Sequence, residues 1–248
     1  METSFFELGK GGKHILLLHG WGADKEKLRP LGKKLAKADW HVVALDLPGF
    51  GATPPPPVPY SVSEYASFIK SFAGVVFKEK PYIVFGHSFG GRIAIKLTLG
   101  DKNVSGVVLC SSSGFTRNSI AKRLFFLTLA KAGKILSVVP SVANAFRFIL
   151  YKAAREHDYQ KAAGVLRPAL RRIVAEDMRP LAARLNVPAL IVWGKEDRMT
   201  PIKGAYKAKH LIPRSLLKIY EDVGHALPYR RPAALAREIT TWSKTFLQ

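Results

Sequence analysis

The chain contains little cysteine, little acid and no long apolar run, and each shortage excludes a class of protein. Its single cysteine, Cys110, excludes an internal disulfide and favours a reducing compartment. No uncharged apolar stretch approaches the roughly 18 residues that a membrane-spanning helix requires. No basic segment followed by an apolar block stands near the amino terminus, so no secretory signal is visible. We therefore expect a cytoplasmic protein with no transmembrane segment.

Positive charge is present in excess: 39 Lys and Arg against 18 Asp and Glu give a formal net charge of +21 over 248 residues. Such a balance is typical of proteins that bind nucleic acids or anionic membrane surfaces. The basic residues are spread along the chain, however, with no zinc-finger spacing, aromatic RNA-binding signature or basic helix before a zipper. We expect no specific nucleic-acid binding. A solvated basic surface and attraction to an acidic partner both stay open.

Apolar runs alternate with helical patterns along most of the chain, and 48% of the residues are hydrophobic. This alternation is typical of an α/β fold with a mostly parallel, doubly wound sheet and helices on both faces. The predicted strands are 14–19, 41–45, 82–85, 105–110, 189–193 and 216–220. The predicted helices are 25–38, 62–77, 88–99, 202–210 and 232–246, the second beginning at a capping box formed by Ser61 and Glu64.

Residues 115–185 interrupt this alternation because they contain helical patterns and no convincing strand. The patterns cover 120–137, 143–155, 159–176 and 178–185, and they are rich in Lys and Arg. Doubly wound sheets place their sites at the carboxyl edge of the strands, which a helical insertion between two strands is suited to cover. We therefore predict a core domain of residues 1–114 and 186–248, and a helical cap, or lid, of residues 115–185.

A short glycine-flanked motif, Gly86-His87-Ser88-Phe89-Gly90, follows the apolar run 82–85 and precedes a mostly apolar helical pattern. The form G-x-S-x-G in a strand–turn–helix context exposes one serine hydroxyl at the tip of a sharp turn. Glycines two positions before and after the serine let the strand and helix approach closely. Ser88 is therefore the candidate nucleophile.

A nucleophilic serine requires a base, and the base requires a group to orient it. His225 follows the last predicted strand, in a loop at the same sheet edge as Ser88. Asp197, in the loop after strand 189–193, is the candidate acid; Glu196 is a weaker choice and Asp222 stands too near His225 in sequence. The other six histidines have more ordinary positions at strand starts, in helices or in turns: His14, His19, His41, His87, His157 and His210.

Backbone amides that stabilise a developing oxyanion complete such a site. One candidate is the amide of Phe89, which follows the nucleophile. The other is the amide of Trp21, in the turn His19-Gly20-Trp21-Gly22 after strand 14–19, where two glycines free the backbone. The order Ser88, Asp197, His225 along the chain is the order of one particular scaffold.

These motifs, with Asp46-Leu47-Pro48-Gly49-Phe50-Gly51 and Thr200-Pro201, give the chain its resemblance to the α/β-hydrolase-fold serine hydrolases. The resemblance covers nearly the whole chain apart from the cap. It implies Ser88, Asp197 and His225 as a catalytic triad, Trp21 and Phe89 as the oxyanion hole, and a cap inserted after the sixth strand. The motifs around Trp21 and Phe50 are similar to those of pimeloyl-carrier-protein methyl ester esterases and of meta-cleavage product hydrolases. The family needs no metal or organic cofactor, so we expect none.

The expected activity is hydrolysis of carboxylic esters with short to medium acyl chains, or of lactones such as acyl-homoserine lactones. Two alternatives stay open: carbon–carbon bond hydrolysis of meta-cleavage products by the same triad, and a non-catalytic binding protein with the basic cap as its interface. The expected partner is a small ester or lactone. The basic cap would also suit an acidic acyl carrier or an anionic surface. A monomer or a dimer is expected.

Overall fold

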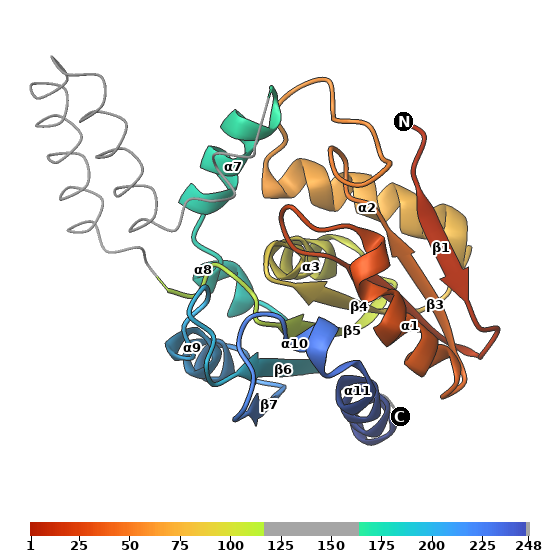
Figure 1. Ribbon diagram of the computed structural model, residues 1–248, viewed down its shortest axis with the longest axis vertical. Coiled ribbons are helices and arrows are strands. Elements are labelled where there is room, and N and C mark those ends of the chain that lie inside the picture. Colours follow the sequence, from red (N-terminus) through yellow and green to blue (C-terminus); the bar gives the residue numbers. More distant parts are fainter. Residues whose placement is uncertain (117–163, 247–248) are drawn as a thin grey trace, which may run out of the picture.

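A seven-stranded sheet forms the centre of the computed structural model, which describes residues 1–116 and 164–246 (Figure 1). Its strands are β1 (Phe5–Leu8), β2 (Lys13–Leu18), β3 (Trp40–Leu45), β4 (Tyr82–His87), β5 (Val104–Cys110), β6 (Ala189–Gly194) and β7 (Ser215–Tyr220). They lie in the order β1-β3-β2-β4-β5-β6-β7; only β1 is antiparallel to its neighbour. The predicted α/β fold with a mostly parallel sheet is confirmed.

Helices cover both faces of this sheet (Figure 1). One face packs against α2 (Val62–Phe77), α3 (Phe89–Gly100), α7 (Leu166–Ala175), α8 (Arg179–Ala182) and α9 (Lys203–Leu211). The other packs against η1 (Lys25–Leu28), α1 (Arg29–Ala36), α10 (Leu227–Arg230) and α11 (Pro232–Phe246). The predicted capping box is present at the start of α2, where Ser61 and Glu64 exchange hydrogen bonds.

The central strands are apolar on both sides because both faces of the sheet are covered. In β2, Leu16 and Leu18 point to one hydrophobic cluster while Ile15 and Leu17 point to the other, and all four are fully buried. Successive side chains of a strand point to opposite faces. The uninterrupted apolar runs of the sequence are therefore two alternating core faces.

Three local predictions were incomplete. Strand β1 was not predicted, because it is a four-residue edge strand in which only Phe6 is buried. The single helix predicted over 25–38 is a 3₁₀ turn, η1, followed by α1, whose first turn contains Pro30. Proline lacks an N–H donor and fits the first turn of a helix, so a new helix begins there. The short helix α10 was also not predicted.

The segment predicted as a cap follows β5, the fifth strand in chain order, so its placement after a sixth strand was wrong. Five strands precede it, including the unpredicted β1. The predicted helices 120–137 and 143–155 lie outside the described residues. The described part of this segment contains α7 and α8, and its residues Ala169, Ile173 and Ala182 are buried in the same cluster as the sheet. Among the described residues, no helix is long and apolar enough to cross a membrane.

Candidate active site

Ser88 occupies a strained turn between β4 and α3. Its backbone has φ 53° and ψ −108°, a conformation that residues other than glycine rarely adopt. Holding such a residue costs on the order of 1–3 kcal/mol, so the surroundings must enforce it. A Cβ on Gly90 would lie 2.5 Å from the carbonyl oxygen of Leu18. The strand, turn and helix therefore pack at a distance that only glycine permits.

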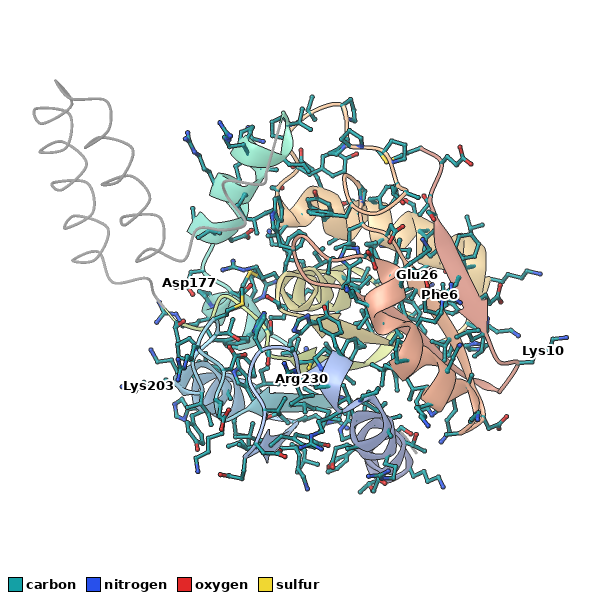
Figure 2. The ribbon with its side chains drawn as sticks, viewed as in Figure 1. Phe6, Lys10, Glu26, Asp177, Lys203 and Arg230 are labelled. Carbon is teal, nitrogen blue, oxygen red and sulfur yellow. The ribbon has the colours of Figure 1, made fainter. Side chains whose placement is uncertain are left out.

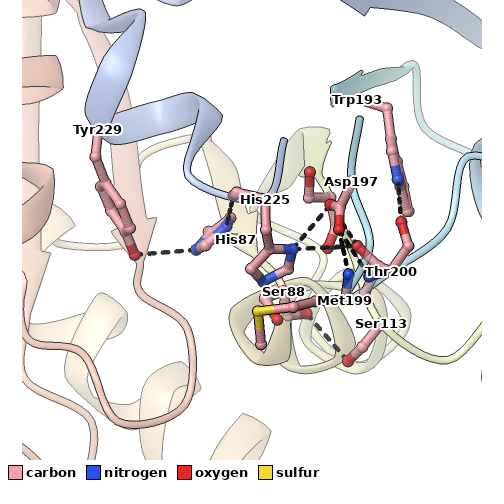
Figure 3. Close-up of polar contacts among 10 residues, drawn as sticks. His87, Ser88, Ser113, Trp193, Asp197, Met199, Thr200, His225 and Tyr229 are labelled. Atoms are coloured by element: carbon pink, nitrogen blue, oxygen red, sulfur yellow. Dashed lines mark hydrogen bonds and ion pairs between the residues drawn. The ribbon is translucent and has the colours of Figure 1, made fainter. Parts of the chain in front are cut away.

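Asp197 and His225 meet at the same edge of the sheet, from the loops after β6 and β7 (Figure 3). The Nδ1 atom of His225 lies 2.8 Å from Oδ2 of Asp197, whose carboxylate is 0% exposed. Three further donors reach this carboxylate: the backbone amides of Met199 and Thr200 and the hydroxyl of Thr200, at 2.7–2.9 Å. This arrangement fixes the His225 ring with Nδ1–H donating to Asp197.

The pKa of Asp197 is lowered although the group is buried. Burial by itself would raise the pKa, but the hydrogen bond and charge of His225 and the two donors of Thr200 outweigh it. Asp197 therefore stays a carboxylate at neutral pH. It can hold the imidazole of His225 in one orientation and stabilise its protonated form.

The loop that carries His225 lies next to the Ser88 turn. Nε2 of His87, the residue before Ser88, lies 2.9 Å from the carbonyl oxygen of His225 (Figure 3). Among the described residues, no hydrogen bond joins the Ser88 hydroxyl to the His225 ring. The structure thus brings the serine, histidine and aspartate to one place, with the Asp197–His225 contact formed.

Trp21 and Phe89, the two candidate oxyanion-hole residues, both lie in turns next to the serine. Phe89 is the first residue of α3, and the turn containing Trp21 follows β2. A Cβ on Gly20 would lie 3.4 Å from Cβ of Ser88, so this turn packs directly against the serine. The rings of Trp21 and Phe89 contact each other, with centroids 5.4 Å apart. Within the described part of the chain, neither backbone amide donates a hydrogen bond to another residue.

His19 organises the loop that carries Trp21, as its position in the sequence suggests. Its Nδ1–H donates to the Gly20 carbonyl at 2.7 Å, and its Nε2 accepts the Leu47 amide at 3.0 Å. The side chain is fully buried, and burial lowers its pKa. A neutral His19 therefore joins the loops after β2 and β3.

His87, the residue before the serine, lies against the loop that carries His225, and the centroids of the two rings are 4.8 Å apart. Its Nε2–H donates to the carbonyl of His225, and its Nδ1 accepts the hydroxyl of Tyr229 at 3.0 Å (Figure 3). Burial and, secondarily, the charge of His225 lower the pKa of His87 to about 3. A neutral His87 therefore stabilises the His225 loop through its hydrogen bond to the His225 carbonyl.

The sequence did not reveal two supporting residues. The hydroxyl of Thr200 reaches both Asp197 and the carbonyl of Ser111, and Tyr229 binds His87. Thr200-Pro201 was visible only as part of a family motif, and nothing in the sequence pointed to Tyr229. The rejected acid Asp222 pairs with Arg231. Among the described residues, no group of three or more His, Cys, Asp or Glu side chains is placed to hold a metal ion.

Comparison with known proteins shows to which family the chain belongs. The family model for the alpha/beta hydrolase family matches residues 15–238. The chain belongs to the alpha/beta hydrolase family. It is 30% identical to the pimeloyl-[acyl-carrier protein] methyl ester esterase of Neisseria meningitidis, over 86% of this chain and 87% of that protein.

One further relative and one solved structure are also similar to this chain. The 2-hydroxy-6-oxo-6-(2'-aminophenyl)hexa-2,4-dienoic acid hydrolase of Metapseudomonas resinovorans is 25% identical, over 95% of this chain and 85% of that protein. A solved esterase from Exiguobacterium antarcticum superposes with a TM-score of 0.74 at 21% identity, over 98% of this chain and 95% of that one. The last comparison shows the shared fold. Together with the family match, the relatives support a hydrolase.

Proposed function

We propose that this alpha/beta hydrolase is a serine esterase that cleaves carboxylic esters of short to medium acyl chains, or lactones such as acyl-homoserine lactones. The observation that carries the proposal is the 2.8 Å contact between His225 and the buried carboxylate of Asp197, beside the strained Ser88. Esters and lactones present the same carbonyl chemistry to a nucleophilic serine. An esterase among the relatives, at 30% identity, supports this choice.

In the proposed mechanism, Ser88 Oγ attacks the substrate carbonyl carbon while Nε2 of His225 takes the hydroxyl proton. The carbonyl oxygen becomes an oxyanion, which the amides of Trp21 and Phe89 stabilise. Protonated His225 gives its proton to the departing alkoxide as the carbon–oxygen bond breaks, leaving an acyl-Ser88 ester. A water molecule, deprotonated by His225, then releases the acid and restores the serine.

The division of the chain follows the same proposal. Residues 1–114 and 186–248 would form the hydrolase core, and residues 115–185 a cap that lines the acyl pocket. Its basic residues would also suit an acidic acyl carrier or an anionic surface. The single cysteine suits a cytoplasmic location. No cofactor or metal has a step in this mechanism.

The test is a Ser88→Ala variant assayed on a panel of p-nitrophenyl esters and homoserine lactones. We expect kcat to fall by about 10⁴-fold or more, because losing the nucleophile leaves only binding and oxyanion stabilisation. The matched control is Ser71→Ala, a serine-to-alanine change on the exposed side of α2, which should leave kcat unchanged. Turnover by folded Ser88→Ala at the wild-type rate would refute the proposal.

A second candidate is carbon–carbon bond hydrolysis of a ring-cleavage product, which the relative at 25% identity favours. It would use the same three side chains. Measuring kcat/KM for a vinylogous diketone beside the ester panel separates the two candidates. A substantially higher value for the diketone would assign the chain to carbon–carbon cleavage.

A further inference from the structure

A buried arginine lies one helical turn after the candidate nucleophile. This residue, Arg92 on α3, is only 6% exposed. Its Nε–H donates to the hydroxyl of Ser113 at 2.7 Å, and its Nη1 donates to the carbonyls of Ile173 and Glu176, both at 2.8 Å. Burying a guanidinium is costly unless its donors are paired. Three good acceptors therefore indicate a position built for this side chain.

The acceptors lie on two separate parts of the segment between β5 and β6. Ser113 lies just after β5, while Ile173 and Glu176 lie at the end of α7, which α8 follows before β6 begins. The amide of Met178 also binds the carbonyl of Gly114, at 3.3 Å. Arg92 thus joins the residues after β5 and the end of α7 to α3.

The same arginine is connected to Ser88 through one intermediate. The backbone amide of Ser113 donates to the carbonyl of Ser88 at 3.1 Å, and the Ser113 hydroxyl lies 3.4 Å from that carbonyl (Figure 3). A hydroxyl has one proton and can accept and donate at once. It accepts from Arg92 and can therefore direct its own proton toward the Ser88 carbonyl. Ser113 therefore links Arg92 to the strained backbone of Ser88.

A neighbouring lysine, Lys96, also contacts Glu176 at the end of α7 and offers a control. Lys96, one turn further along α3, lies 2.5 Å from the carboxylate of Glu176. It therefore joins α3 to the end of α7, as Arg92 does. Among its described contacts, Lys96 has none with Ser113 or Ser88. Replacing Lys96 weakens the junction between α3 and α7 without touching the connection to the serine.

We propose that Arg92 is a positioning residue that holds the Ser88 turn in its reactive conformation by bridging Ser113 and the end of α7. This role rests on the proposed function, because it presumes that Ser88 is the nucleophile. Arg92 acts through Ser113 and through its own helix; it does not touch the substrate. Its loss would displace Ser88 relative to His225, and misplacement by about 1 Å can cost about 100-fold in rate.

The experiment compares Arg92→Met, Arg92→Lys, Ser113→Ala and Lys96→Met with the wild type. The measurements are the rate at which a fluorophosphonate labels Ser88, kcat and KM for a p-nitrophenyl ester, and the melting temperature. We expect Arg92→Met to lower the labelling rate and kcat by about 10- to 100-fold with little change in KM. Arg92→Lys should recover part of this loss, because an ammonium keeps a donor but lacks the planar fork.

Ser113→Ala keeps the inference testable if Arg92→Met fails to fold, since it removes only the hydroxyl between Arg92 and Ser88. We expect it to slow labelling by several-fold, and Lys96→Met to label at the wild-type rate. Wild-type labelling by folded Arg92→Met and Ser113→Ala, with only melting temperature reduced, would overturn the positioning role while leaving the esterase proposal intact. Labelling of Ser88→Ala at the wild-type rate would overturn the esterase proposal and the role of Arg92 with it.

Discussion

The carboxyl edge and the amino edge of the parallel sheet each carry a pair of histidines and a carboxylate. Only at the carboxyl edge do these groups lie beside a candidate nucleophile. At the carboxyl edge, His87 and His225 have ring centroids 4.8 Å apart, and His225 contacts Asp197. At the amino edge, the rings of His14 and His41 are 5.0 Å apart, and His41 lies 2.5 Å from Glu7. The two clusters are similar in composition and in spacing.

Burial and neighbouring donors distinguish them. The Asp197 carboxylate is 0% exposed and receives four donors, whereas the Glu7 side chain is 53% exposed. The amino edge has a groove of about 660 Å³ whose lining includes Lys10, Lys78 and Lys80 (Lys10 is labelled in Figure 2), and no serine is among the described residues that line it. An exposed ion pair contributes little because water screens it. A histidine–carboxylate contact becomes useful for catalysis where burial fixes both partners beside a nucleophile.

The largest expected difference between the edges concerns catalysis. Asp197→Asn should lower kcat for an ester by about 10⁴-fold, because an amide cannot hold His225 in the required tautomer or stabilise its positive charge. Glu7→Gln removes the corresponding carboxylate at the amino edge and should leave kcat within about two-fold of wild type. Steady-state assays of both purified variants provide the comparison. A comparable loss in the two variants would mean that carboxylate burial does not separate the edges.

A smaller difference is expected for stability. Gly90→Ala would place a Cβ 2.5 Å from the Leu18 carbonyl, and relieving that overlap should cost about 1–3 kcal/mol of unfolding free energy. Gly12→Ala, before β2, meets no atom within 4 Å and should be neutral or stabilising by up to about 1 kcal/mol. Urea unfolding measures both. If Gly90→Ala were as stable as Gly12→Ala, the tight packing around the serine would not need glycine.

A third difference is expected in the response to pH. The pKa of His87 is lowered to about 3, so below pH 6.5 the unfolded chain binds a proton that the folded chain does not. Stability is therefore fully present above pH 6.5 and falls as the pH drops toward 3, by about 1.4 kcal/mol per pH unit from this group. Replacing His87 by Gln should make the decline between pH 6.5 and 5 shallower.

His14→Gln is the control at the other edge. The pKa of His14 is also lowered, by burial, by His41 and by Lys80, but His14 is only partly buried whereas His87 is fully enclosed, so the slope should change much less. Urea unfolding at several pH values compares the two variants with wild type. A decline in His87→Gln as steep as in wild type would show that His87 is not held neutral by the fold.

The sequence predicted well what depends on local pattern. Fully buried central strands appeared as apolar runs, and the capping box at Ser61 marked the start of α2. The short edge strand β1 escaped prediction because Phe6 alone is buried there, which leaves no alternating pattern. Pro30 marks the boundary between η1 and α1, but a helical pattern spans both elements.

The candidate site was foreseen as a set of residues, while its supports were not. Ser88, Asp197 and His225 are recognisable from motifs and from chain order. Arg92, which joins α3 to α7, and Tyr229, which binds His87, act through contacts between distant parts of the chain. No local pattern carries such contacts. The pairing of a buried polar side chain becomes visible only when the tertiary structure is known.

The assembly of the site from the loops after β2, β4, β6 and β7 has a consequence for the order of events during folding. His87 and His225 meet across 138 positions of sequence, so the contact forms only when the last strand has joined the sheet. Contacts between distant positions form late, because the intervening chain must first lose its freedom. A nascent chain that ends before β7 would hold Ser88 without its partner. The appearance of hydrolase activity during refolding would therefore report when the whole sheet is complete.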